Sequence, residues 1–239
     1  MRRSVTMSER PQAHYRERFY QRILALKPKS VLDIGCGDGA LVTRLKADGI
    51  EATGLEPDAE TVAELKEAGV EAIQGVAESL PLDDRAVDLV VHEFTAHHLA
   101  DLSGSFFEGL RVGRHGVLVL DMWYDESIPS QRIARRFDRW CKVIDRRYGM
   151  VHNDNISAGA FLDALSPWDG ELDVAVDHHF IPHPLGPDEL QTIGQDQLGL
   201  IPADGALIGE LAEILDEARS VGCTDDGAII VSVLHADGG

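Results

Sequence analysis

A glycine-rich loop is the segment of this chain whose residue types and spacing are best suited to ligand chemistry. The sequence VLDIGCGDGALVTRL places Gly35, Gly37 and Gly39 directly after a short apolar run. Glycines let the backbone turn sharply and approach a ligand closely, and a helix that begins after them favours a polar or anionic group at its N-terminus. Glu56 lies 21 residues beyond Gly35, where a carboxylate can accept both hydroxyls of an adenosine ribose. The pattern predicts a site for a ligand that contains adenosine.

The loop alone leaves more than one class of ligand open. With Ala40 as its last member it satisfies the G-x-G-x-x-A pattern of dinucleotide-binding enzymes, so an NAD-dependent oxidoreductase is compatible with it. A glycine loop that binds nothing is a third interpretation, which the acid at the right distance disfavours. The segments after the loop decide between these interpretations.

The elements that must position the loop alternate along the chain. Strands are expected near residues 30–35, 51–56, 70–75, 86–93, 116–122, 172–181 and 227–236. Helices are expected near residues 11–27, 40–49, 58–69, 105–113, 131–147, 156–165, 186–198 and 206–222. Strands that alternate with helices of about a dozen residues form right-handed βαβ units, so the predicted fold class is α/β with a parallel sheet.

Several motifs follow one another in order. D-x-G-C-G-x-G spans Asp33–Gly39, and Glu56-Pro57 ends the second expected strand. GVAESLPLDDRAVDLVV then spans Gly75–Val91, HEFTAHHLAD spans His92–Asp101, and RVGRHGVLVLD closes on the fifth expected strand. With these motifs, residues 28–122 resemble the class I S-adenosylmethionine-dependent methyltransferases, particularly the small-molecule branch with the menaquinone and ubiquinone methyltransferases. A dehydrogenase has no reason to carry the later motifs.

The resemblance implies a Rossmann-like fold of seven mostly parallel strands, with helices on both faces and a helical lid inserted after the fifth strand. The expected parts are an N-terminal helical segment (1–30), a cofactor-binding core (31–123), a lid or acceptor region (124–170), and strands and helices that complete the same domain (171–239).

The resemblance also implies which residues bind S-adenosylmethionine. Gly35 and Gly37 expose backbone to the methionine portion, and Asp33 lies near its ammonium group. The remaining expected cofactor residues are Glu56 at the ribose, Pro57 and Ala77 at the adenine, Glu78 beside it, and His92 at the methionine end. Many relatives carry Asp where this chain has Val76, so either Glu78 accepts from the adenine amino group or that hydrogen bond is lost.

Methyl transfer needs alignment of the reactants and exclusion of water more than a dedicated base, so the sequence offers a set of candidates for the residues that act on the acceptor. We expect His97 as the general base, with Asp121 and Glu93 as other candidates near the carboxyl ends of strands. The expected acceptor contacts are Tyr20, His98, Trp123, Tyr124, Arg136 and His152. Each of these side chains is also compatible with ordinary packing or turn chemistry.

The charge of the chain is unevenly distributed. The net charge is −19, which disfavours binding to nucleic acid or to an anionic membrane surface. Residues 1–30 carry +6, residues 131–147 carry +5, and the rest of the chain carries −30. On a helical wheel the basic residues of 131–147, Lys142 included, share one face. That face is either ion-paired with an acidic body or a grip for an anionic acceptor.

The cysteines and histidines suggest neither a disulfide framework nor a metal site. Cys36, Cys141 and Cys223 are far apart and form no C-x-x-C pair, and no apolar segment follows the basic N-terminus, so we expect a cytoplasmic protein. The densest histidine cluster, residues 178–183, lacks a completing cysteine or carboxylate, and we expect no metal.

The resulting hypothesis is a methyltransferase that uses S-adenosylmethionine on a small-molecule acceptor, with an anionic metabolite favoured by the arginines. The alternatives are a non-catalytic protein of the same fold that binds cofactor or a partner, and the NAD-dependent oxidoreductase. Helix faces late in the chain are compatible with a homodimer.

Overall fold

The computed structural model describes residues 9–236, which fall into two compact units, and residues 1–8 of the expected N-terminal segment lie outside the described residues. The sheet unit comprises Arg16–Asp121, Ile156–Asp177 and the chain from Ile229 onward. The helical unit comprises the chain up to Tyr15 together with Met122–Asn155 and His178–Ala228. Within residues 9–236, no helix combines the length and the apolar character that a membrane span requires.

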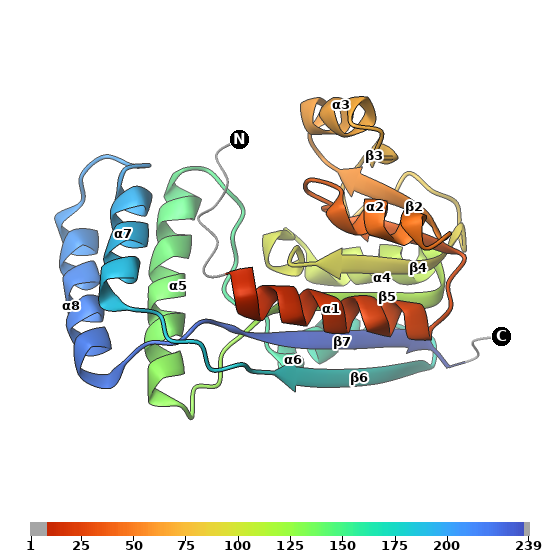
Figure 1. Ribbon diagram of the computed structural model, residues 1–239. Helices are drawn as coiled ribbons and strands as arrows, with labels where there is room; N and C mark the ends of the chain where they lie inside the picture. Colours follow the sequence, from red (N-terminus) through yellow and green to blue (C-terminus); the bar gives the residue numbers. More distant parts are fainter. Residues whose placement is uncertain (1–8, 237–239) are drawn as a thin grey trace. The chain divides into compact units, whose positions relative to one another are not determined.

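The sheet unit is built on seven strands in the order β3-β2-β1-β4-β5-β7-β6. Their bounds are β1 Ser30–Ile34, β2 Glu51–Glu56, β3 Ala72–Gln74, β4 Val87–Glu93, β5 Gly113–Trp123, β6 Leu172–His179 and β7 Gly227–His235. The pairs β1–β2, β1–β4, β2–β3 and β4–β5 are parallel, and β7 runs in the opposite direction to β4 (Figure 1). The ends of β5, β6 and β7 belong to the helical unit.

Helices cover both faces of the sheet, with α1 in front of it and α4 and α6 behind it in Figure 1. The helices that belong wholly or mainly to this unit are α1 Glu9–Ala25, α2 Ala40–Ala47, α3 Ala59–Glu67, α4 Leu102–Val112 and α6 Ala158–Leu165, with the short 3-10 turn η1 Ala96–His98. Residues 89–91 of β4 and 117–120 of β5 are apolar and completely buried, as strands covered on both faces require. The predicted seven-stranded, mostly parallel sheet with helices on both faces is confirmed.

The helical unit packs three helices together: α5 Pro129–Arg147, α7 Pro187–Leu198 and α8 Gly205–Val221. Its core includes Phe137, Trp140 and Ile144 of α5, which lie at helical spacing on one face. The rings of Phe137 and Trp140 stack with centroids 5.8 Å apart, and the indole N–H of Trp140 donates to the carbonyl of Leu207 at 3.0 Å. This apolar face therefore holds α5 against its neighbours.

Residues 124–170, expected as one lid, are divided between the two units. Helix α5 packs with α7 and α8, whereas α6 packs on α4, where the rings of Phe161 and Phe106 lie 5.7 Å apart. The helices expected after the fifth strand are present, but they serve two different cores.

One residue of α5 lies elsewhere than predicted. Lys142 does not share the exposed face of the arginines, because its side chain is completely buried. Its ammonium group lies 3.0 Å from the Asp138 carboxylate and 3.2 Å from the side-chain oxygen of Asn155. A buried ammonium needs such partners, so α5 has a buried polar face between its apolar and arginine faces.

The stacked pair predicts where the helical unit is most sensitive. Replacing Trp140 with Ala removes a fully buried ring and leaves the Leu207 carbonyl without its donor, so the free energy of unfolding should fall by about 3–5 kcal/mol. Urea unfolding followed by far-ultraviolet circular dichroism measures the loss. Tyr148→Ala is the control, because this exposed side chain should change stability by less than about 0.5 kcal/mol. Equal losses in both variants would contradict the assignment of Trp140 to the core.

Candidate functional site

The glycine loop lies where β1 passes into α2, and all three of its glycines have left-handed backbone. The φ angles are +67° at Gly35, +57° at Gly37 and +72° at Gly39, a region that side chains with a Cβ rarely adopt. The amide of Gly35 donates to the carbonyl of Leu55 at 2.8 Å, which ties the start of the loop to β2. The loop is thus fixed at the carboxyl edge of the parallel strands, where ligands of open α/β sheets bind.

Three carboxylates gather at this edge, one from each of three adjacent strands. Asp33 belongs to β1, Glu56 ends β2 and Glu93 ends β4. One oxygen of Glu56 accepts the amide N–H of Gly37 at 2.6 Å, and Glu93 lies 3.2 Å from the Nε of Arg16. The register of the sheet, with Asp33 opposite Gly54 and Val91, brings the three acids together.

Burial controls the electrostatics of these acids. Desolvation raises the pKa of Asp33 well above its usual value, and the nearby charges of Glu93 and Glu56 raise it further. Burial likewise raises the pKa of Glu56 and of Glu93, although Arg16 opposes the effect at Glu93. A cationic group bound here would relieve the mutual repulsion of these carboxylates.

Two observations show that the residues fit a ligand with an ammonium group. The Oδ1 atom of Asp33 is buried and has no hydrogen-bond partner among the described residues. A Cβ built on Gly37 meets nothing within 4 Å, whereas one built on Gly35 would collide with Thr95. The loop thus has open space at Gly37, and one oxygen of Asp33 in the preceding strand lacks a donor.

The adenine-side residues lie in the same unit and differ in their exposure and contacts. Ala77 is buried, and Pro57 is exposed at the end of β2. One oxygen of Glu78 accepts the amides of Ala100 at 3.0 Å and Asp101 at 3.2 Å. This contact uses one oxygen of Glu78 to hold the start of α4.

His92 is completely buried in β4, and burial lowers the pKa of its imidazole to about 4. Its Nδ1 atom has no partner among the described residues, and its ring meets Phe106 edge to face at 6.4 Å. The side chain is therefore neutral near pH 7.

The predicted base lies in η1, directly after the fourth strand. Nδ1 of His97 is 2.6 Å from one oxygen of Asp121, and the backbone N–H of His97 donates to the other oxygen at 3.0 Å. Both side chains are buried. The ring of His98 lies 4.2 Å from that of His97, centroid to centroid. The structure thus brings together two base candidates, His97 and Asp121, that the sequence offered separately.

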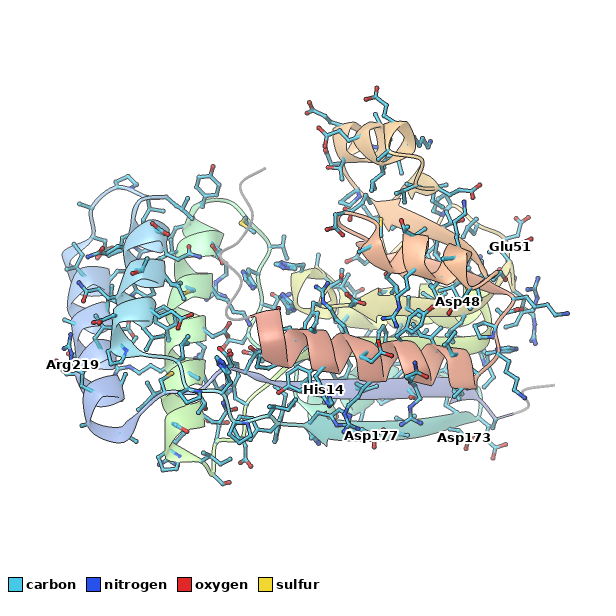
Figure 2. All side chains as sticks on the ribbon, in the orientation of Figure 1. His14, Asp48, Glu51, Asp173, Asp177 and Arg219 are labelled. Carbon is cyan, nitrogen blue, oxygen red and sulfur yellow. The ribbon has the colours of Figure 1, made fainter. Side chains whose placement is uncertain are left out.

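Tyr20 is not placed as an acceptor contact. Its hydroxyl donates to Asp48 at 2.6 Å, and the guanidinium of Arg44 lies 3.5 Å over its ring. Asp48, labelled in Figure 2, follows the C-terminal end of α2, whereas the glycine loop precedes the N-terminal end. Tyr20 therefore packs α1 on α2 at the end remote from the loop, and the sequence expectation for it is corrected.

Four of the expected acceptor residues belong to the helical unit: Trp123, Tyr124, Arg136 and His152. The ring of Trp123 lies 4.5 Å from that of His178, and Nδ1 of His152 is 2.8 Å from Asp145. The hydroxyl of Tyr124 is buried without a hydrogen-bond partner among the described residues. Burial raises the pKa of Tyr124 well above its usual value, and the charges of Asp138 and Asp226 add to the effect.

Arg136 is engaged by acids of α8. Its guanidinium lies 2.6 Å from Glu217 and 2.8 Å from Glu213, and Glu210 is within 3.9 Å. Arg136 is therefore ion-paired with acids of the protein, which is the first of the two interpretations of the arginine face.

Sequence reasoning missed three residues of the site, Arg16, Phe94 and Thr95. Arg16 pairs with Glu93 and lies 5.5 Å over the ring of Phe94, and the hydroxyl of Thr95 donates to the carbonyl of Glu93 at 3.2 Å. Arg16 is one of several arginines in its helix, so no local signal distinguishes it. Phe94 has a φ of +53°, a strained conformation that only the structure reveals.

The comparison with protein families agrees with this geometry. Residues 32–120, from β1 to β5, match the family model described as a methyltransferase domain. Residues 32–120 therefore form a methyltransferase domain. The acids and the glycine loop fit the ammonium and ribose groups of S-adenosylmethionine, the cofactor that a methyltransferase domain of this fold uses.

Curated relatives at about one-third identity match a large part of this chain. It is 34% identical over 115 residues to an uncharacterized methyltransferase of Mycobacterium tuberculosis, with 47% of each chain covered. It is 34% identical to a demethylmenaquinone methyltransferase of Thermotoga maritima, covering 44% of this chain and 48% of that one. A malonyl-[acyl-carrier protein] O-methyltransferase of Enterobacter lignolyticus is 31% identical, with 63% and 58% covered. The chain spans about half the length of the curated relatives it matches.

Solved structures share the fold over nearly the whole chain. The YcgJ protein of Bacillus subtilis superposes with a TM-score of 0.63 at 21% identity, covering 93% of this chain and all of that one. A SAM-dependent methyltransferase from Archaeoglobus fulgidus gives a TM-score of 0.57 at 17% identity, with 92% and 93% covered. The methyltransferase fold thus extends beyond the matched domain to the later helices and strands.

The open space at Gly37 yields a matched test of the methyltransferase site. Gly37→Ala and Gly49→Ala both place a Cβ at a left-handed residue with no neighbour within 4 Å, so their costs to folding should be alike. Only the methyl group at Gly37 enters the space expected for the cofactor. Calorimetry should show weaker binding of S-adenosylhomocysteine, about tenfold or more, in the Gly37 variant alone. Equal affinity in the two variants would place the ligand elsewhere.

The raised pKa values predict a pH dependence of cofactor binding. A cationic ligand needs Asp33, Glu56 and Glu93 ionised, and burial raises the pKa of all three, so their protonated fraction grows as pH falls. Affinity for S-adenosylhomocysteine should fall as the pH is lowered from neutral toward the usual carboxyl range, with release of protons on binding at the lower pH. Calorimetry in two buffers of different ionisation enthalpy measures that release. Proton uptake on binding would contradict this account.

Proposed function

We propose that the whole chain is an S-adenosylmethionine-dependent methyltransferase that acts on a small-molecule acceptor. The observation that carries this proposal is the juxtaposition of the left-handed glycine loop with three desolvated carboxylates on adjacent strands. The relatives named for quinone and malonyl-thioester substrates support a small molecule as the acceptor class.

The residues of the sheet unit divide the binding task. Asp33, with its unpartnered oxygen, would accept from the ammonium of the cofactor, and Glu56 would accept from the ribose hydroxyls. In the structure Glu56 already accepts the Gly37 amide at 2.6 Å, which holds its carboxylate against the loop. Arg16 favours the ionised form of Glu93 and is not itself proposed to contact the cofactor.

When bound, S-adenosylmethionine supplies a methyl group on a sulfonium sulfur, a carbon that a nucleophile can displace in line. The chain must then align the acceptor, exclude water and, for a protonated nucleophile, accept a proton. His97 is the residue we propose for that proton, because its imidazole is held by a buried carboxylate in the sheet unit.

Trp123, Tyr124 and His152 are proposed as acceptor contacts. The support is chemical: Tyr124 has a buried hydroxyl with no hydrogen-bond partner in the described chain, and a bound polar acceptor would satisfy it. His98, next to the proposed base, is the matching candidate in the sheet unit. Arg136 is left out of this set because three glutamates engage it.

The composition supports the expected setting of the protein. The net charge of −19 supports the proposal that the protein does not bind nucleic acid. The free cysteines support the proposal that it is cytoplasmic. A homodimer is supported by exposed Ile208 and by a groove of about 310 Å³ beside it on α7 and α8.

The function is tested by turnover with methyl-labelled S-adenosylmethionine and a panel of small hydroxyl, amine and carboxylic acid acceptors. Label should move to at least one acceptor, with S-adenosylhomocysteine released in equal amount.

Glu56→Ala should raise the KM for the cofactor about tenfold or more, because it removes the charged carboxylate that is proposed to accept hydrogen bonds from the ribose hydroxyls. Glu60→Ala, an exposed acid in α3, should leave that KM unchanged. Cofactor binding without transfer to any acceptor would favour the non-catalytic alternative.

A further inference from the structure

His97 and Asp121 contact each other at two points, so each oxygen of the carboxylate has its own partner. Asp121 lies near the end of β5, and its two oxygens meet two different groups of His97. Oδ1 lies 2.6 Å from the ring Nδ1, and Oδ2 accepts the backbone N–H at 3.0 Å. If the carboxylate rotated away from this arrangement, it would lose the hydrogen bond from the backbone N–H of His97.

This arrangement determines the tautomer of the neutral imidazole. An ionised carboxylate only accepts hydrogen bonds, so the ring nitrogen that faces it must carry the proton. The Nδ1 of His97 is therefore the donor, and Nε2 carries the basic lone pair. Because both side chains are buried, water does not compete for this contact.

The neighbouring histidines do not compete for the same charge. His92 feels the charge of Asp121, but burial lowers its pKa to about 4, so it stays neutral near pH 7. His98 lies beside His97 at 4.2 Å and belongs to the same short turn. The close carboxylate of Asp121 is therefore in place to stabilise an imidazolium formed at His97.

We infer that Asp121 is the positioning residue of a His–Asp pair in which Nε2 of His97 takes a proton from the acceptor. The inference rests on the proposed methyltransferase function and adds the class of acceptor. The nucleophile arrives with a proton that it must lose, as a hydroxyl or an acidic carbon does, rather than as a carboxylate or a thiolate.

The step balances in atoms and charge. The acceptor's lone pair forms the bond to the methyl carbon, and the electron pair of the carbon–sulfur bond returns to sulfur. The acceptor's proton moves to Nε2 of His97, and Asp121 stays ionised beside the new imidazolium.

The isosteric variant Asp121→Asn separates positioning from packing. The backbone N–H of His97 must still meet an acceptor, so the amide oxygen takes the place of Oδ2 and the amide NH₂ group faces Nδ1. The ring must then accept at Nδ1 and carry its proton on Nε2. The variant should keep the shape of the site and invert the tautomer.

Nitrogen-15 NMR of the full chain with labelled histidines measures the tautomer of His97 and needs no acceptor. The His97→Gln variant assigns the signals, because those of His97 are missing from its spectrum. We expect Nδ1–H in the native chain and Nε2–H in Asp121→Asn, with S-adenosylhomocysteine affinity unchanged. Asp83→Asn, which alters an exposed acid, should leave the tautomer as it is. On an acceptor found in the turnover screen, kcat should fall about 10²-fold or more in Asp121→Asn while KM changes little.

The failures of the two proposals are distinguishable. A proton on Nε2 in the native chain, or a tautomer unchanged by Asp121→Asn, overturns the inference even when S-adenosylhomocysteine binds. An unchanged kcat in that variant overturns it as well. Absence of S-adenosylhomocysteine binding with the expected tautomer would instead contradict the proposed function.

Discussion

The burial of three carboxylates at the carboxyl edge of one sheet is the constraint on which the site depends. Asp33, Glu56 and Glu93 come from strands that are adjacent because the sheet order is β2-β1-β4. Desolvation raises the pKa of each of these acids, and at Asp33 the charges of Glu93 and Glu56 raise it further. Such an arrangement is costly in the empty protein and becomes favourable when a cation is bound, which is the chemistry of the cofactor's methionine end.

The glycine loop and the proposed base share that edge and are held by the same strands. Thr95, in the loop after β4, lies so close to Gly35 that a Cβ there would overlap it, so the two loops are locked together. The next residues form η1, whose His97 is bound by Asp121 of β5. The elements that position the glycine loop therefore also position His97, and a shift of β4 against β1 would disturb both.

The sequence predicted the parts of the site that local patterns encode. The glycine loop, the acid at the end of β2 and the order of strands and helices follow from spacing within short segments, and the fold and the cofactor class are confirmed. The sequence did not predict side-chain contacts between residues that lie far apart in the chain. Arg16 reaches Glu93 from a helix far away in the chain, Arg136 is occupied by glutamates of α8, and Lys142 is buried although its spacing placed it with exposed arginines. Each of these outcomes depends on which helix face meets which neighbour, and periodicity alone does not determine that.

The central claim is that the acidic edge and the glycine loop form a site for S-adenosylmethionine. Calorimetric titration of the purified chain with S-adenosylhomocysteine, and separately with NAD, tests it most directly. We predict saturable one-to-one binding of S-adenosylhomocysteine and no binding of NAD. Binding of NAD alone, or of neither compound, would contradict the account.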